Sequence, residues 1–306
     1  MKKIKVEDAI GYVIPHDLTR IVKGEFKGPA FKKGHIIEES DIPVLLKMGK
    51  EHIYVLEIEE NMVHEVEAAE VLGRICKGDN MSLTGVSEGK IGIKADIDGF
   101  FQVDRERLLK LNMIDDVAIA VRHGNLPVKK GDSLAGARVI PLLVEKNVLD
   151  EAETIWNNEP ILKLKPFIKK NIGIITTGSE VYHGRIKDQF TPVIKEKVEA
   201  FGSKVTFHRT CDDDLNQIKD AILEAVDSGC DFVLCTGGMS VDPDDLTPGA
   251  IKETGANIIS YGSPMLPGSM FLVSYLKDIP VLGLPGCVMF MKTTVFDVIL
   301  PFIISD

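Results

Sequence analysis

Small residues gather in three segments of the second half of this chain, at residues 177–179, 236–248 and 284–288. Each segment contains glycine and follows an apolar run. Glycine lets a ligand approach the backbone closely, and free main-chain amides at the start of a helix attract phosphate. Residues 171–306 hold only 10 Lys and Arg side chains against 18 Asp and Glu, so backbone amides and hydroxyls would have to do most of the binding. The three segments predict a site for a small molecule that carries phosphate.

Carboxylates stand beside the glycine pair Gly237-Gly238. Asp242, Asp244 and Asp245 follow it in the same segment. Proteins typically hold Mg²⁺ with one or two carboxylates together with phosphate oxygens of the substrate, so this segment could hold such a cation. Spacing alone leaves a second interpretation open, in which the segments are simple turns and the acids cap a helix that begins near Pro248.

Alternating strands and helices must position these segments. Residues 171–306 show continuous apolar runs, typical of strands buried on both faces, separated by helical stripes. We predict strands at 171–176, 204–208, 231–235, 258–259 and 280–284, and helices at 191–201, 215–226 and 288–299. This order predicts the α/β class, with a three-layer, open, mostly parallel sheet and helices on both faces. Such sheets bind ligands beyond the carboxyl ends of their strands.

The first part of the chain is predicted to be rich in short strands. Its apolar runs are short and divided by Gly, Pro and Asp, with helices expected near 39–48 and 105–111. The pair Asp98-Gly99 predicts a hairpin between residues 93–97 and 100–103. A basic, proline-containing connector at 163–170 places the domain boundary, giving domains 1–170 and 171–306. The first domain allows a further division into two small subdomains near 58–70.

Composition excludes several classes of protein. The 306 residues carry a net charge of −10, which argues against a nucleic-acid or anionic-membrane partner. No apolar run reaches the roughly 18–20 residues that a spanning helix needs, and no apolar segment follows the first lysines as in a secretory signal. The five cysteines form no Cys-x-x-Cys pair, which makes a zinc site or disulfide framework unexpected. We therefore expect a cytoplasmic protein.

The loops resemble those of the molybdopterin-binding domain shared by molybdopterin adenylyltransferases, molybdopterin molybdotransferases and gephyrin. Thr236-Gly-Gly followed by Asp245 is similar to that family's Gly-Gly loop, and Asp245-Leu-Thr-Pro248 resembles the adenylyltransferase branch. Pro267-Gly268 and Leu284-Pro-Gly286 resemble the two Pro-Gly loops of the molybdotransferase branch, as does the segment 31–49. The resemblance spans essentially all of 171–306 and implies a divergent molybdotransferase-like protein.

This resemblance implies molybdopterin or its adenylated form as ligand, together with Mg²⁺. It implies catalytic and metal-binding roles for Asp244 and Asp245. The positions implied to bind the pterin are Thr177, Gly178, Ser179, Glu180, Asp188, Thr236, Gly237, Gly238, Ser240, Pro267, Gly268, Ser269, Pro285, Gly286 and Cys287.

Three positions depart from the molybdotransferase pattern. Ser179 replaces the acid of Thr-Gly-Asp-Glu, Phe190 replaces the amide of Asp-Ser-Asn, and Cys287 replaces the Asn of Leu-Pro-Gly-Asn-Pro. These losses put metal insertion in doubt more than binding, and the sequence leaves open whether the protein is an enzyme.

Two alternative functions stay open. Residues 237–247 also resemble a loop of competence-damage-inducible-type proteins, which implies a divalent-metal-dependent nucleotide pyrophosphatase with Asp244 and Asp245 as metal ligands. A non-catalytic cofactor sensor or scaffold is the other alternative. The molybdopterin-binding resemblance further implies a homo-oligomer, a dimer or trimer, with molybdoenzymes or other cofactor-biosynthesis proteins as partners.

Overall fold

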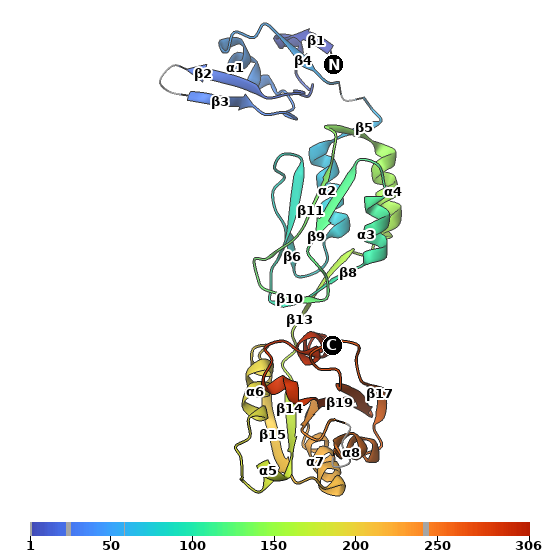
Figure 1. Cartoon of the computed structure of the whole chain (residues 1–306). Helices are drawn as coiled ribbons and strands as arrows, with labels where there is room; N and C mark the ends of the chain where they lie inside the picture. Colours follow the sequence, from blue (N-terminus) through green and yellow to red (C-terminus); the bar gives the residue numbers. More distant parts are fainter. Residues whose placement is uncertain (1, 23–25, 58, 241–244) are drawn as a thin grey trace. The chain divides into compact units, whose positions relative to one another are not determined.

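The computed structural model describes residues 2–22, 26–57, 59–240 and 245–306 (Figure 1). The chain forms two compact units, residues 1–165 and 166–306. The expected boundary after residue 170 lies close to this division and stays a prediction. None of the helices among these residues is long and apolar enough to cross a membrane.

A single six-stranded sheet forms the centre of the second unit. Its strand order is β15 (Lys204–Cys211), β14 (Asn171–Thr177), β16 (Phe232–Thr236), β19 (Ile279–Leu284), β18 (Leu272–Leu276) and β17 (Asn257–Tyr261). The first four strands run parallel, and β18 is antiparallel to both of its neighbours, β19 and β17, so only β18 runs in the opposite direction. The predicted mostly parallel α/β sheet is confirmed.

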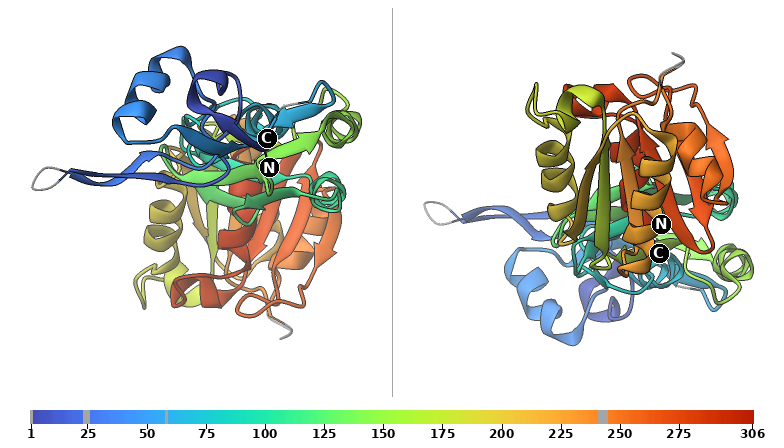
Figure 2. Two further views of the ribbon diagram at one scale, coloured as in Figure 1. Left: turned by 90° about the horizontal axis from the view of Figure 1, so that it is seen from above. Right: turned by 90° about the horizontal axis from the view of Figure 1, so that it is seen from below.

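Helices cover both faces of this sheet (Figure 2). Neighbouring side chains of β14 point to opposite faces, as the period of a strand requires. Ile174 packs in one core with α6 (Phe190–Glu199) and α9 (Val295–Ile303), and Ile175 packs in the other with α7 (Leu215–Asp227) and α8 (Thr247–Glu253). The continuous apolar run of this strand therefore follows from burial on both sides.

Capping side chains set where two of these helices begin. The Asp214 carboxylate accepts a hydrogen bond from the Gln217 amide at 2.8 Å, so α7 begins where its sequence predicts. The last helix was predicted from residue 288, which is wrong. A 3₁₀ turn covers Gly286–Met289, and α9 begins only at Val295 because Thr294 and Asp297 form a capping box there.

The first unit contains two hydrophobic cores. One lies among residues 6–55, where β1 (Lys2–Lys5) pairs with β4 (His52–Val55) and β2 (Leu18–Val22) pairs with β3 (Phe26–Phe31), beside α1 (Ile42–Lys47). The other lies among residues 63–164 and includes α2 (Glu65–Cys76), α3 (Arg105–Asn112) and α4 (Lys146–Trp156). Its largest sheet has the order β6 (Met81–Leu83), β7 (Lys90–Ala95), β11 (Ser133–Val139) and β9 (Val117–Val121). The predicted β-rich region is confirmed, with more helix than its sequence indicates.

The hairpin predicted at Asp98-Gly99 is wrong. Strand β7 pairs with β6 and β11, whereas β8 (Gly99–Val103) lies in another sheet, between β10 (Leu126–Val128) and β13 (Leu162–Pro166). Gly99 is needed for a close approach, since a Cβ there would lie 2.4 Å from the carbonyl oxygen of Lys165. A local turn signal was overridden by a long-range strand contact.

Candidate functional site

The glycine pair after β16 lets two neighbouring parallel strands end close together. Gly237 has a φ of +87°, and a Cβ there would lie 2.2 Å from the carbonyl oxygen of Thr177 at the end of β14. Gly238 has a φ of +53°, and its Cβ would meet the Thr247 hydroxyl at 3.0 Å. Glycine adopts these positive φ values most readily, and at Gly237 any larger residue would overlap the Thr177 carbonyl oxygen.

Threonine hydroxyls hold this junction together. The Thr177 hydroxyl donates to the Thr236 carbonyl at 3.2 Å and lies 3.1 Å from the Thr247 hydroxyl, which donates to the Gly237 carbonyl at 2.8 Å. The Thr236 hydroxyl is buried without a partner among the described residues. The ends of β14 and β16 and the start of α8 thus form one rigid unit.

Two cavities adjoin this junction. The first, of about 340 Å³, has walls from the ends of β14 and β16, from α5 (Ser179–Tyr182) and from the segment before α6. Its described lining residues are Thr177, Gly178, Glu180, Val181, Ile186, Lys187, Gln189, Phe190, Asp213, Gly237, Gly238, Asp245 and Met289. The second, of about 300 Å³, is lined by Gly237, Gly238, Met239, Ser240, Asp245, Met270, Pro285 and Gly286. The two cavities share Gly237, Gly238 and Asp245, so they adjoin each other at these residues.

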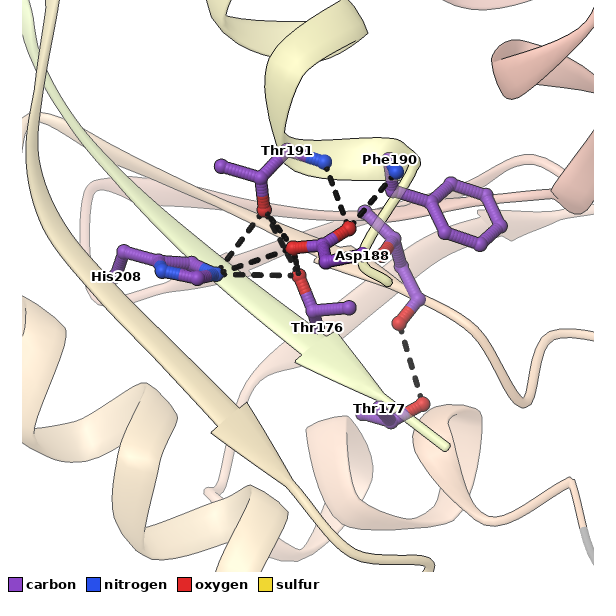
Figure 3. A network of polar contacts seen from close by, with 7 residues as sticks. Thr176, Thr177, Asp188, Phe190, Thr191 and His208 are labelled. Carbon is purple, nitrogen blue, oxygen red and sulfur yellow. Dashed lines mark hydrogen bonds and ion pairs between the residues drawn. The ribbon is translucent and has the colours of Figure 1, made fainter. Parts of the chain in front are cut away.

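A polar network anchors the segment before α6 (Figure 3). The Asp188 carboxylate accepts hydrogen bonds from the Phe190 amide at 2.8 Å and from the Thr191 amide and hydroxyl at 3.0 and 2.5 Å. The Thr191 hydroxyl lies 3.0 Å from the His208 Nε2 atom on β15 and 3.1 Å from the Thr176 hydroxyl on β14. This network ties the cavity wall at residues 187–190 to two strands of the sheet.

The pKa of Asp188 reflects these contacts. Burial raises the pKa of this carboxyl, but the hydrogen bonds from Thr191 and Phe190 together outweigh burial, so the pKa lies below its usual value. Asp188 is therefore ionised at neutral pH and acts as an N-terminal cap of α6.

A second polar cluster holds α5 to the end of β15. The Ser179 hydroxyl donates a very short hydrogen bond to Asp212, the Ser179 amide donates to Asp213 at 2.9 Å, and His183 lies 3.3 Å from Asp212. The hydrogen bond from Ser179 is the main cause that lowers the pKa of Asp212. Ser179 and His183 both contact Asp212 and not each other. A serine nucleophile is activated when its hydroxyl is hydrogen-bonded to the histidine, so this cluster does not have the arrangement of a catalytic triad.

The structure brings most of the predicted site residues to the two cavities and leaves others aside. Those that line a cavity are Thr177, Gly178, Glu180, Gly237, Gly238, Ser240, Asp245, Pro285 and Gly286. Those that line neither of the two are Ser179, Asp188, Thr236, Pro267, Gly268, Ser269 and Cys287. Asp244 lies outside the described residues. The roles of all these residues stay predictions.

The residues left aside have structural surroundings of their own. A Cβ at Gly268 would lie 3.1 Å from the Val295 amide, so this glycine allows the preceding loop to pack on α9. Partial burial raises the pKa of the Cys287 thiol, which disfavours its thiolate.

Several cavity residues were not predicted from the sequence. Lys187 and Gln189 flank Asp188, so the capping position of Asp188 was the available signal for them. Val181, Phe190 and Met289 give the first cavity an apolar wall, but nothing in their local patterns marks them as ligand-facing.

The first cavity has an acidic wall. Among its described lining residues, Glu180, Asp213 and Asp245 are acidic and only Lys187 is basic. In the described part of the chain, no three His, Cys, Asp or Glu side chains are grouped so that they could hold a metal ion by themselves. A metal ion here would need oxygen atoms from the ligand in addition to Asp245.

Comparison with known proteins gives two matches to sequence families. Residues 3–57 match a domain of unknown function (DUF8806), and residues 173–305 match the probable molybdopterin binding domain. The molybdopterin molybdenumtransferase of Staphylococcus aureus (strain COL) is 29% identical over 131 residues, which cover 40% of this chain and 31% of that protein. The chain thus matches about a third of the length of this curated relative.

Two solved structures are similar to part of this chain. The protein CinA with unknown function from Thermoplasma acidophilum has a TM-score of 0.40 at 20% identity and covers 44% of this chain and 99% of its own. The molybdopterin biosynthesis enzyme MoaB from Thermus thermophilus has a TM-score of 0.36 at 22% identity. The match covers 43% of this chain and 90% of the MoaB chain. The family match over residues 173–305 lies within the second unit and makes this part of the chain similar to the probable molybdopterin binding domain.

Proposed function

We propose that this protein binds molybdopterin or its adenylated form and acts in molybdenum-cofactor biosynthesis, metal insertion or delivery. The observation that carries the proposal is the convergence of three glycine-containing loops on two adjoining cavities that share Gly237 and Gly238. These loops lie in the unit that matches the probable molybdopterin binding domain. An elongated ligand would lie across the shared loop, with one end in each cavity.

The walls of the first cavity suit a ring with polar edges. Val181, Phe190 and Met289 offer apolar contact, and the Glu180 and Asp213 carboxylates can accept hydrogen bonds from N–H groups of a pterin. Cavities that bind small molecules usually combine such an apolar lining with a few polar groups, in volumes of roughly 300–1,000 Å³.

The acidic wall gives a reason for including Mg²⁺ in the proposal. Three carboxylates and one lysine would repel a phosphate that arrived alone. A divalent cation held by Asp245 and by the ligand's own phosphate oxygens would neutralise this charge, with Asp244 as a second proposed ligand. Lys187 would contribute the remaining positive charge.

The proposal extends to the setting of the protein. The five free cysteines, four of them buried, suit a reducing cytoplasm. We also propose that the protein forms a dimer or trimer. It would transfer the pterin to molybdoenzymes or to other cofactor-biosynthesis proteins.

Calorimetric titration of the full chain with molybdopterin, with and without Mg²⁺, tests this function. We expect binding in both conditions and tighter binding with the cation. Lys187→Ala should weaken binding about tenfold, equivalent to about 1.4 kcal/mol. Lys195→Ala is the matched control, because Lys195 is exposed and pairs with Glu199 in α6.

The same samples separate binding from catalysis. Release of AMP from adenylated molybdopterin in the presence of molybdate would identify a molybdotransferase, and binding without release would identify a carrier or sensor. Turnover of ADP-ribose with a divalent metal would instead support the pyrophosphatase alternative. Absence of pterin binding would refute the proposal.

A further inference from the structure

A separate cavity of about 780 Å³ lies within the first unit, and the proposed function does not use it. Residues of the β3 end, the start of α2, the turn before β7 and strand β11 line it. Its volume falls within the range of roughly 300–1,000 Å³ that small-molecule sites occupy.

The most unusual group in this cavity is the carboxylate of Glu65, at the start of α2. The Glu65 side chain is only 8% exposed, and the nearest cation, the Arg138 guanidinium, is 3.8 Å away. Within the described ranges, no donor hydrogen-bonds to the Glu65 carboxylate. Most buried carboxylates are hydrogen-bonded within the protein. The Glu65 oxygens are not among the fully buried atoms without a partner, so they are open to the cavity that Glu65 lines.

Two glycines enclose this carboxylate. Gly34 and Gly89 have φ values of +87° and +68°, and a Cβ at these positions would lie 2.5 and 2.2 Å from the two Glu65 oxygens. Any side chain at either position would displace the carboxylate. The backbone is therefore shaped to hold Glu65 in the wall of the cavity.

Several other charged groups around the cavity already have partners. Lys32 pairs with Glu88 at 3.1 Å, and His35 contacts Asp41 at 2.6 Å. The Asp17 carboxylate accepts a hydrogen bond from the Lys33 amide at 2.7 Å, whereas the Glu65 carboxylate accepts none from the described residues and is an acceptor that the cavity offers to a ligand.

We propose that this cavity binds a small planar molecule that presents an N–C(NH₂)–N edge, the donor pattern shared by guanine and pterin rings. The two oxygens of a carboxylate match two adjacent N–H donors in a bidentate pair. Phe31 and Val86 supply an apolar wall for the ring. Lys33 lies at the same cavity, and its ammonium, which lacks a partner among the described residues, suits a phosphate on the ligand.

Calorimetric titration of the full chain with GMP, IMP and pterin tests this site. IMP lacks only the 2-amino group of GMP, so we expect it to bind at least tenfold more weakly than GMP. Glu65→Gln should weaken GMP binding at least tenfold, since the amide presents a donor where the ligand needs an acceptor. Glu67→Gln is the matched control, because Glu67 is an exposed carboxylate in the same helix and lies outside the cavity.

The outcomes separate cleanly. Pterin binding that is tighter than GMP binding and is weakened by Glu65→Gln would name the pterin ring as the ligand of this cavity, and tighter GMP binding that is weakened by the same substitution would name guanine. Equal affinity for GMP and IMP, unchanged GMP binding by a folded Glu65→Gln variant, or no binding of GMP and pterin would overturn the proposal. If circular dichroism shows that Glu65→Gln does not fold, the comparison of GMP with IMP on the unaltered protein decides.

Discussion

Gly237 occupies a backbone position that no other residue can take without moving Thr177. Two costs coincide there, a φ of +87° and a Cβ position 2.2 Å from a carbonyl oxygen. Gly229 offers a comparison, because its φ is +86° but nothing lies within 4 Å of its Cβ position. Comparing Gly237 with Gly229 therefore distinguishes the cost of backbone strain from the cost of steric overlap.

Replacing each glycine by alanine should measure these two costs. Gly229→Ala is expected to lower the free energy of unfolding by about 1–2 kcal/mol, the cost of a left-handed backbone. Gly237→Ala should lower it by roughly 2–5 kcal/mol, because overpacking adds about 1–3 kcal/mol. Urea titrations followed by circular dichroism give both values. Equal losses would show that the Thr177 carbonyl yields without cost.

Among the elements, α6 depends most visibly on a single charged cap. Asp188 joins its first turn to β14 through Thr176 and to β15 through Thr191 and His208 (Figure 3). The same cap positions Lys187 and Gln189 in the wall of the first cavity. The start of a helix and the shape of a cavity are thereby determined together.

Removing this cap should destabilise the protein in a pH-dependent way. Asp188→Ala is expected to cost about 1–2 kcal/mol at pH 7. Because the folded-state pKa of Asp188 is lowered, its contribution is complete above the unfolded-state value of about 3.9 and is lost as the pH falls through the folded-state pKa. The difference between the unaltered protein and the variant should therefore shrink below about pH 4.

Urea titrations at pH 7 and pH 3.5 check this expectation. Asp220→Ala is the control, since Asp220 is exposed in α7 and forms no capping hydrogen bond or ion pair with the described residues. A difference for Asp188→Ala that is constant with pH would contradict the proposed ionised cap.

At the scale of the whole molecule, each unit has its own cores. Two clusters of buried side chains lie on either face of the sheet in residues 166–306, and two more lie in residues 1–165. The two proposed ligand sites also fall in different units.

Residues 166–306 expressed alone are therefore expected to fold. Thermal unfolding of this fragment should be a single cooperative transition, because its sheet is covered on both faces by its own helices. Its affinity for molybdopterin should stay within about threefold of that of the full chain, a change of about 0.65 kcal/mol. A fragment without a cooperative transition would show that the first unit completes its core.

Much of the second unit could be predicted from the sequence, because its signals are local. The apolar run at 171–176, the stripe from Leu215 to Val226 and the Asp214 cap each act within one element, and the structure places β14 and α7 there. The glycine pair at 237–238 was likewise recognisable as a special turn, because glycine is the usual residue where the chain takes a positive φ or approaches another backbone closely.

The sequence by itself determined the class of the second unit and the loops that end its strands. Only the tertiary structure decided which side chains face the cavities, such as Lys187 and Met289, and that Glu65 lies buried beside Gly34 and Gly89. It also decided that β8 pairs away from β7. The physical reason is range: periodicity and capping are set by neighbours in the chain, whereas cavities, buried charges and sheet partners depend on contacts between residues far apart in sequence.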